Sequence, residues 1–193
     1  MHLRTAHPHD ADALADLHVR AWQRAYRGLM PAAFLDGLSV TDRIDLWHEV
    51  LDDPPRRSAQ LLLEDLGRAV GFVLVGGEEL KADAARGEVY ALYVDPDHWR
   101  RGVGSALLAA GCDRLRAVGF GDAVLWVHEG NERARVFYTA RGWAADGTRR
   151  RQTVLGIEAP EVRYRRVLPG RGAPCDRDTE GYSDFAQRRT LTF

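Results

Sequence analysis

The sequence is poor in lysine, in cysteine and in long apolar runs, and each shortage carries information. Lys81 is the only lysine among 27 basic side chains, a bias typical of high-GC bacterial genomes to which we attach no function. The two cysteines, Cys112 and Cys175, do not make a disulfide framework, so a reducing compartment is expected. No apolar run approaches the ~20 residues that span a bilayer, and no apolar leader follows Met1. We therefore expect a cytoplasmic protein.

The sequence also lacks an excess of charge of either sign. Its formal net charge is -1, so electrostatics favour neither a nucleic acid nor a membrane as a partner. A length of 193 residues suits one domain with a sizeable core. The composition turns polar after Leu168, so we expect one domain over residues 1–168 and a flexible polar tail over residues 169–193. The alternative for the tail is a segment that covers the active site or a partner chain.

Apolar periodicity predicts a mixed α/β chain. Short β-branched and apolar runs predict strands, and apolar residues at helical spacing predict helices that end at Gly or Pro. The expected strands are Leu3–Ala6, Gln60–Glu64, Ala69–Val75, Glu88–Val94, Ala123–His128, Thr148–Leu155 and Glu161–Leu168. The expected helices lie between Pro8 and Gly28, between Ser39 and Pro54, from Ser105 to Val118 and from Asn131 to Arg141.

The segment from Asp95 to Leu108 carries the first functional pattern. A strand ends, the chain turns through Gly102 and Gly104, and a helix begins at once. The first N–H groups of a helix have no internal partner, and with the helix dipole they attract an anion. Glycine lets the backbone approach a phosphate closely, and Arg100 and Arg101 add positive charge. The segment therefore predicts a site for a pyrophosphate-bearing cofactor.

Two other phosphate-binding patterns fit this segment less well. A dinucleotide-binding turn requires a third glycine where Leu107 stands, and an acidic residue about 20 residues on, where the sequence gives Ala123 to Leu125. A P-loop requires a Gly-Lys-Ser or Gly-Lys-Thr ending, which the segment lacks. A glycine-rich loop without a ligand remains the structural alternative.

The second pattern lies on the predicted helix that begins at Asn131. Ala134 and Tyr138 fall one turn apart on one face of that helix, with Asn131 a turn earlier. A small residue at position 134 lets a ligand lie against the helix, and Tyr138 could present its phenol to that ligand. Taken alone, Tyr138 is better explained as an amphipathic core tyrosine.

Together the two patterns resemble the GNAT superfamily of N-acetyltransferases. Leu92-Tyr93-Val94-Asp95-Pro96 through Arg101-Gly102-Val103-Gly104-Ser105-Ala106-Leu107-Leu108 is similar to its acetyl-coenzyme A motif, and Asn131 to Tyr138 with Gly142-Trp143 is similar to its following motif. Trp99 departs from the family, which most often has Gln or Arg there. The resemblance implies a central mixed, mostly antiparallel sheet with helices on both faces and a splayed, bulged cofactor-binding strand.

The resemblance also implies how acetyl-coenzyme A, without any metal, would be held. Main-chain groups around Leu92, Tyr93 and Val94 would bind the pantetheine arm. Asn131 and Tyr138 would contact the arm near the thioester, with Ala134 and Phe137 packed beside it. The pyrophosphate would lie on the turn formed by Arg100, Arg101, Gly102, Val103, Gly104 and Ser105.

The implied chemistry is direct attack of an amine on the thioester. An alkyl amine with a pKa of about 10 must lose a proton, and the leaving thiolate must gain one. Tyr138 is the expected general acid, because the pKa of a phenol, about 10, lies above that of a thiol, about 8.5. Glu88 is the expected base, with a solvated strand-end Glu as the equal alternative and His128, Glu129 or a water chain as competitors. Trp126 stands where ribosomal-protein-type enzymes have Glu, which argues against their substrates.

The expected acceptor site involves Trp22, Tyr26 and His128, although core packing explains Trp22 equally well. The leading hypothesis is an enzyme that acetylates the primary amine of a small molecule. The alternatives are acetylation of a protein N-terminus or lysine, and a non-catalytic acyl-coenzyme A-binding module. A peptide acceptor and a homodimer therefore stay open.

Overall fold

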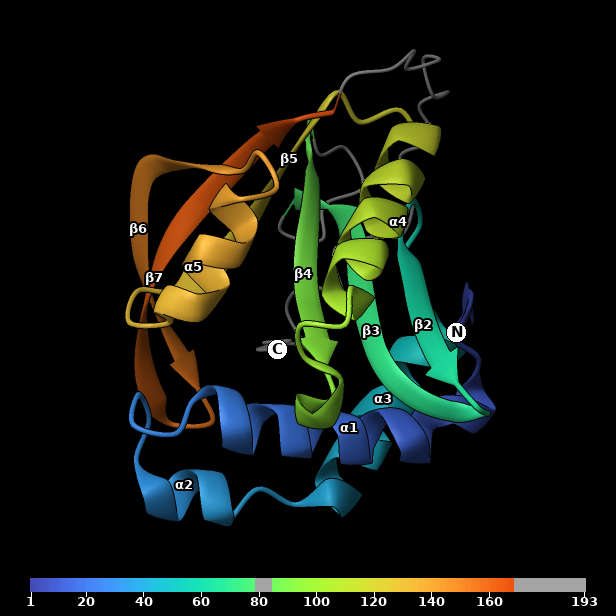
Figure 1. Ribbon diagram of the computed structural model, residues 1–193, viewed down its shortest axis with the longest axis vertical. Helices are drawn as coiled ribbons and strands as arrows, with labels where there is room; N and C mark the ends of the chain where they lie inside the picture. The colour runs from blue at the N-terminus through green and yellow to red at the C-terminus, as the bar shows by residue number, and fades with distance from the viewer. Residues whose placement is uncertain (79–84, 169–193) are drawn as a thin grey trace. The chain divides into compact units, whose positions relative to one another are not determined.

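The computed structural model describes residues 1–78 and 85–168. Seven strands are hydrogen-bonded in the order β1-β2-β3-β4-β5-β7-β6. The strands are β1 His2–Thr5, β2 Ala59–Asp65, β3 Arg68–Gly77, β4 Gly87–Val94, β5 Asp122–His128, β6 Ala144–Val154 and β7 Ile157–Val167. The helices are α1 Ala11–Ala25, α2 Ala32–Asp36, α3 Val40–Asp52, α4 Val103–Ala117 and α5 Glu132–Thr139, with short 3-10 turns η1 Pro8–Asp10 and η3 Pro96–His98 (Figure 1).

The sheet is mixed, as the resemblance to the GNAT superfamily implies. β1 pairs with β2, β5 with β7 and β6 with β7 in antiparallel fashion. β4 pairs with β5 in parallel through Gly87–Ala123, Glu88–Val124 and Val89–Leu125. Among the described helices, none is long and apolar enough to cross a membrane.

Element types agree with the sequence-based expectations, and the differences are local. The short helix α2 was not predicted, because Gly28 and Pro31 were interpreted only as the end of the preceding helix. β6 starts at Ala144 instead of Thr148, and its pairing with β7 is irregular between Ala145 and Arg149. The predicted tail over residues 169–193 lies outside the described residues.

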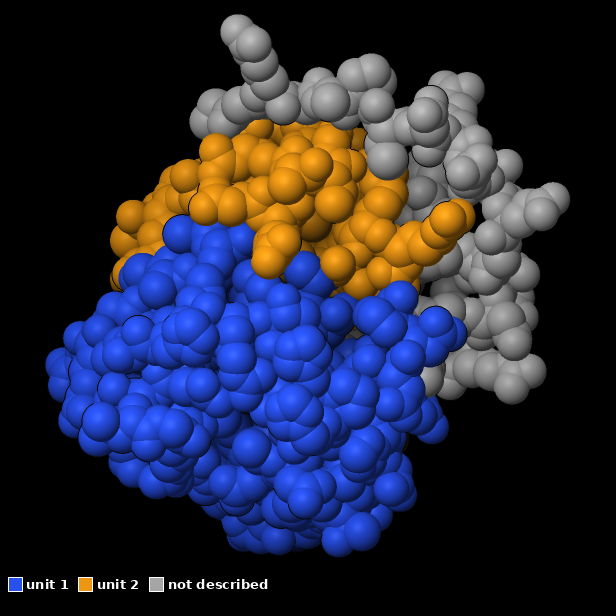
Figure 2. Space-filling model, turned by 90° about the vertical axis from the view of Figure 1, so that its right-hand side faces the viewer, with its two compact units in different colours: residues 1–54, 59–74, 91–111 blue, residues 55–58, 75–90, 112–193 orange. Residues whose placement is uncertain are grey.

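The chain divides into two compact units, coloured separately in Figure 2. Unit 1 comprises residues 1–54, 59–74 and 91–111, and unit 2 comprises residues 55–58, 75–90 and 112–193. β3, β4 and α4 each contribute residues to both units. Each unit has its own buried core.

The core of unit 1 covers both faces of β3. Phe72 packs edge-on against Trp47 of α3, with ring centroids 4.8 Å apart, and against His18 of α1 at 5.8 Å. The neighbouring residue Gly71 faces α4, where an added Cβ would lie 2.7 Å from Leu107 Cδ1. Since successive residues of a strand point to opposite faces, helices cover both faces of the sheet in this unit, as predicted.

The core of unit 2 forms where α5 packs on β7. The ring of Tyr138 lies 6.4 Å from that of Trp143 and 6.3 Å from that of Tyr164. The start of α5 is fixed by Asn131, whose Oδ1 accepts a hydrogen bond from the N–H of Ala134 at 3.1 Å. This cap satisfies one of the open donors of the first turn and sets the direction of the helix.

Candidate functional site

The predicted phosphate-binding turn lies in unit 1 and opens α4. Arg100 and Gly102 have positive φ angles of 60° and 85°, and α4 begins at Val103. The N–H of Ala106 donates a hydrogen bond to the carbonyl of Gly102 at 3.0 Å and closes the first turn of α4. The N–H groups of Val103, Gly104 and Ser105 come before this bond, at positions where the helix itself supplies no acceptor. A left-handed residue followed by a helix N-terminus is a backbone arrangement suited to an anion.

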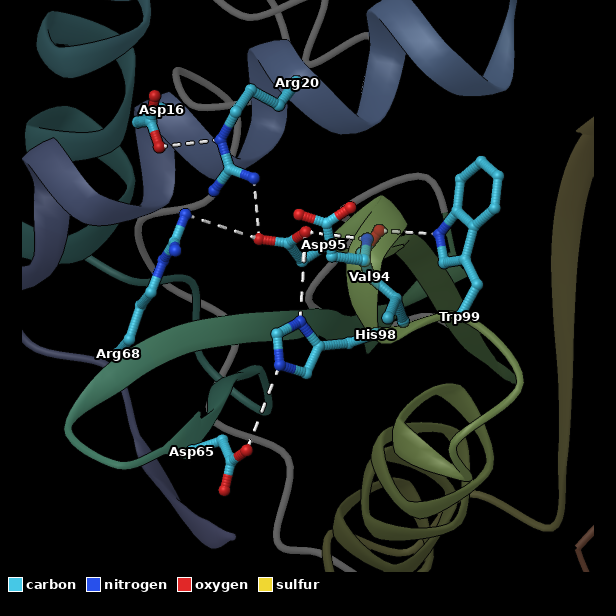
Figure 3. Close-up of polar contacts among 9 residues, drawn as sticks. Asp16, Arg20, Asp65, Arg68, Val94, Asp95, His98 and Trp99 are labelled. Carbon is cyan, nitrogen blue, oxygen red and sulfur yellow. Dashed lines mark hydrogen bonds and ion pairs between the residues drawn. The ribbon is translucent and has the colours of Figure 1, made fainter.

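Asp95 anchors the start of this turn, as Figure 3 shows. Its carboxylate is 1% exposed and accepts hydrogen bonds from Arg20 Nη1 at 2.6 Å and from the N–H of Asp97 at 3.0 Å. Arg68 and His98 lie 3.8 and 3.9 Å from the same carboxylate. Burial alone would raise the pKa of Asp95, but these hydrogen bonds and charges outweigh it and lower the pKa. This role of Asp95 was not predicted from the sequence, in which Asp95 marks only the end of a strand.

Trp99, the departure from the family pattern, ties the turn to the preceding strand. Its indole Nε1 donates a hydrogen bond to the carbonyl of Val94 at 2.9 Å (Figure 3). An indole offers a donor and no acceptor, so it fits a carbonyl at the end of a strand. The departure therefore has a structural use at the carbonyl of a residue predicted to hold the cofactor.

The side chain of Tyr93 lies in the core of unit 1. Its ring stacks on His18 at 5.2 Å, and its hydroxyl lies 3.3 Å from that of Tyr26. Any contact of Tyr93 with a cofactor would therefore use its main chain, as the sequence analysis expects for Leu92 and Val94. Trp22 is 2% exposed and Tyr26 is half-buried, so the core explanation weighed for Trp22 describes its environment.

In unit 2, α5 carries the second group of predicted residues. Tyr138 is 9% exposed and contacts the ring of Phe137, 5.2 Å away. Ala134 and Phe137 are half-buried, and the guanidinium of Arg141 lies 3.9 Å from the centroid of the Phe137 ring. Asn131 is buried with its Oδ1 occupied by the helix cap, so its amide N–H groups are the part available for a ligand.

The three candidate bases, all in unit 2, have different surroundings. Glu88 is buried within the parallel ladder opposite Val124, so the solvated strand-end alternative is wrong. His128 Nδ1 accepts a hydrogen bond from the N–H of Gly130 at 3.1 Å, so the neutral imidazole carries its proton on Nε2. Burial lowers the pKa of His128 despite the nearby carboxylates. Glu129 forms an ion pair with Arg149.

Trp126, where a Glu was considered, faces cations instead. The guanidinium of Arg150 lies 4.1 Å from the centroid of its ring, and that of Arg163 lies at 5.7 Å. Arg150 also donates to Glu161 at 2.7 Å. Among the described residues, no group of three or more His, Cys, Asp or Glu side chains is placed to hold a metal ion.

The predicted site residues therefore occur in both units. The turn, the end of β4, Trp22 and Tyr26 belong to unit 1. Glu88, His128 and the residues of α5 belong to unit 2.

Comparison with protein families identifies the class of enzyme. Residues 12–143 match the model of the Acetyltransferase (GNAT) family. The chain belongs to this family, and it is an acyltransferase of the N-acetyltransferase type. The match includes both sequence patterns, from the turn at Arg100 to Tyr138.

Particular relatives span much of the chain. An uncharacterized N-acetyltransferase, YuaI of Bacillus subtilis, is 29% identical over 72% of this chain and 77% of its own length. Mycothiol acetyltransferase of Clavibacter sepedonicus is 36% identical over 82% of this chain, which spans 43% of that enzyme. The PaiA N-acetyltransferase of Thermoplasma acidophilum, solved with coenzyme A, has a TM-score of 0.65 at 16% identity and covers 86% of this chain and 98% of its own. This last likeness confirms the fold.

Proposed function

We propose that the protein transfers an acetyl group from acetyl-coenzyme A to the primary amine of a small molecule. The observation that carries the proposal is the backbone of the phosphate-binding turn. Arg100 and Gly102 are both left-handed, and α4 begins at the next residue, Val103. A related fold bound to coenzyme A supports the choice of cofactor. In this proposal the N–H groups of Val103, Gly104 and Ser105 hold the pyrophosphate, beside the charges of Arg100 and Arg101.

Tyr138 is the proposed general acid, and Glu88 is the proposed base. The nucleophilic amine forms a bond to the thioester carbonyl carbon, its proton leaves to Glu88 directly or through water, and the C–S bond breaks as the sulfur accepts a proton from Tyr138. Glu88 is buried on β4, the strand that also carries Leu92 and Val94, and this placement supports its role. The engagement of His128 Nδ1 and the pairing of Glu129 with Arg149 make these two side chains weaker candidates.

A small-molecule acceptor is favoured over a protein by one comparison. The relative from Clavibacter sepedonicus is named for mycothiol, a small molecule, although this chain spans less than half of that enzyme. Trp126 packs against the guanidinium groups of Arg150 and Arg163 and offers no carboxylate at the position considered for ribosomal-protein-type enzymes. Acetylation of a protein N-terminus or lysine remains the alternative for the same chemistry.

The proposal is tested by an acetyl-transfer screen. Purified protein is mixed with acetyl-coenzyme A and a panel of small amines, polyamines, amino acids and peptides, and release of free thiol is followed. Turnover with a small amine that exceeds turnover with peptides is the expected result. Binding of coenzyme A by calorimetry without turnover on any amine would instead support a non-catalytic acyl-coenzyme A-binding module.

A further inference from the structure

Unit 1 contains a buried cluster of polar and aromatic side chains that the proposed chemistry does not use. It consists of His18, Trp22 and Tyr26 of α1, Arg43 of α3 and Tyr93 of β4, and we call it the Arg43 cluster. Arg43 is 8% exposed and its Cζ lies 5.7 Å from the centroid of the Trp22 ring. The two tyrosine hydroxyls lie 3.3 Å apart.

Two hydrogen-bond donors in this cluster are buried without an acceptor. Arg43 Nη2 and Trp22 Nε1 have no hydrogen-bond partner within the part of the chain that the structure describes. Guanidinium and indole groups carry donors and no acceptor, so each of these two N–H groups needs an acceptor from another group. Buried polar groups in native proteins are nearly always hydrogen-bonded, and an unpaired one costs about 1–3 kcal/mol or more when charged. The guanidinium of Arg43 lies over the ring of Trp22, which favours a single acceptor for both donors.

Charge makes the requirement stronger for Arg43. No ion pair joins Arg43 to a carboxylate among residues 1–78 and 85–168, although Asp42 and Tyr93 favour its charged form from a distance. Burial lowers the pKa of Arg43, but a guanidinium starts so high that it stays protonated near neutral pH. The face of Trp22 offsets part of the desolvation through a cation–π contact. An anion beside Arg43 would balance the rest of the cost of burying its charge.

We propose that Arg43 Nη2 and Trp22 Nε1 bind a carboxylate of the amine acceptor, so that the substrate is an amino acid-like molecule. A monoanion fits better than a phosphate, because the cluster holds a single cation. The ring of His18 adds no second charge, since burial lowers its pKa well below the ordinary value. This inference rests on the proposed acetyl transfer and specifies the class of its acceptor.

The side chains that pack against Trp22 are themselves partly exposed. The rings of Tyr26 and Phe34 lie 5.1 and 6.5 Å from that of Trp22, and both residues are half-buried. Phe34 belongs to the five-residue helix α2, whose short length makes local movement inexpensive. Two partly exposed aromatic side chains therefore pack against the ring that carries one of the donors.

The first test compares acceptors that differ only in the carboxylate. Initial rates of thiol release are measured for β-alanine against β-alaninamide and for γ-aminobutyrate against its amide, with wild-type protein and with Arg43→Met. Because a hydrogen bond to a charged group contributes about 1.5–3 kcal/mol, wild-type kcat/KM should favour each acid about 10-fold to 100-fold. Arg43→Met should abolish this preference. Equal rates for acid and amide, or a preference that survives in Arg43→Met, overturn the proposal.

The second test needs no turnover, so it separates failure of this inference from failure of acetyl transfer. The indole N–H signal of Trp22, assigned with Trp22→Phe, is followed by NMR while sodium acetate or acetamide is added. A saturable shift with acetate alone supports the carboxylate site, even if no amine in the panel is acetylated. The same response to both compounds, or no response to either, overturns it. Should Arg43→Met not fold, Trp22→Phe replaces it in the rate comparison, because it removes the indole donor and keeps an aromatic ring.

Discussion

Arg20 of α1 donates a 2.6 Å hydrogen bond from Nη1 to the buried carboxylate of Asp95, at the start of the phosphate-binding turn. A second arginine, Arg27, lies just beyond the end of α1 and donates an equally short bond to Asp36. The two pairs differ in burial, since the side chain of Asp95 is 1% exposed and that of Asp36 is 61% exposed. The two pairs therefore allow a comparison between a buried ion pair at the start of the turn and one on the surface.

Replacement of Arg20 should destabilise the protein and weaken cofactor binding together. Arg20→Gln leaves the Asp95 carboxylate buried with a weaker partner, so a loss of about 1–3 kcal/mol in the free energy of unfolding is expected. Arg27→Gln, the matched control, should cost less than about 1 kcal/mol. Urea unfolding and calorimetry with coenzyme A provide the two measurements. Equal effects of both substitutions on affinity for coenzyme A would remove Arg20 from the positioning of the turn.

Acid should destabilise the protein through Asp10 and Asp95. The Arg4 guanidinium, bonded to both carboxylate oxygens of Asp10 at 2.7 Å, lowers the pKa of Asp10, and the pKa of Asp95 is also lowered. A group whose pKa is lower in the folded state contributes stability above its unfolded pKa of about 3.9, and that contribution disappears as the pH falls through the folded pKa.

The expected result is a nearly constant contribution from these carboxylates above about pH 5 and a progressive loss below about pH 4. Urea unfolding from pH 3 to pH 7 measures it. Asp10→Asn should lower stability at neutral pH and flatten the acid-side decline. An unchanged acid-side slope in Asp10→Asn would contradict the assignment.

The sequence predicted the elements better than it predicted their connections. Periodicity and the cap at Ser39, whose Oγ accepts from the N–H of Asp42 at 3.1 Å, were sufficient to locate α3. The bond from Arg20 to Asp95 joins residues 75 positions apart, so no local pattern in the sequence indicates it. The same holds for the burial of Glu88, which depends on the strand that pairs beside it. Helix caps and periodicity can be recognised in the sequence, while burial and long-range pairing depend on the fold.

Trp99→Phe should test whether the unusual tryptophan matters for its hydrogen bond or for its ring. The substitution removes the donor at 2.9 Å from the Val94 carbonyl and keeps an aromatic side chain. A loss of about 0.5–1.5 kcal/mol in unfolding free energy is expected from one neutral hydrogen bond. Trp99→Gln, which restores a donor of the family type, should recover part of that loss. Wild-type stability in Trp99→Phe, with Trp99→Gln less stable than both, would show that the ring alone is used.

Gly102→Ala should weaken the binding of coenzyme A through backbone strain. Gly102 has φ of 85°, and an added Cβ would meet nothing within 4 Å, so conformation and not collision determines the cost, about 1–2 kcal/mol. Gly156 in the β6–β7 turn has φ of 84° and is equally open, which makes Gly156→Ala a matched control. Both variants should lose similar stability, while only Gly102→Ala loses affinity for coenzyme A in calorimetry. Full affinity in Gly102→Ala would contradict the phosphate-binding role of the turn.

Tyr138→Phe should separate catalysis from binding. Loss of a general acid lowers the rate of group transfer by about 10²-fold to 10⁴-fold, whereas the phenyl ring keeps the contacts with Phe137 and Trp143, so affinity for coenzyme A should change little. Tyr164→Phe is the control, because its ring lies 6.3 Å from that of Tyr138 in the same core and its hydroxyl accepts from Arg135. We expect Tyr164→Phe to retain turnover. Wild-type turnover in Tyr138→Phe would exclude the tyrosine as the acid and leave the leaving thiolate to be protonated by water.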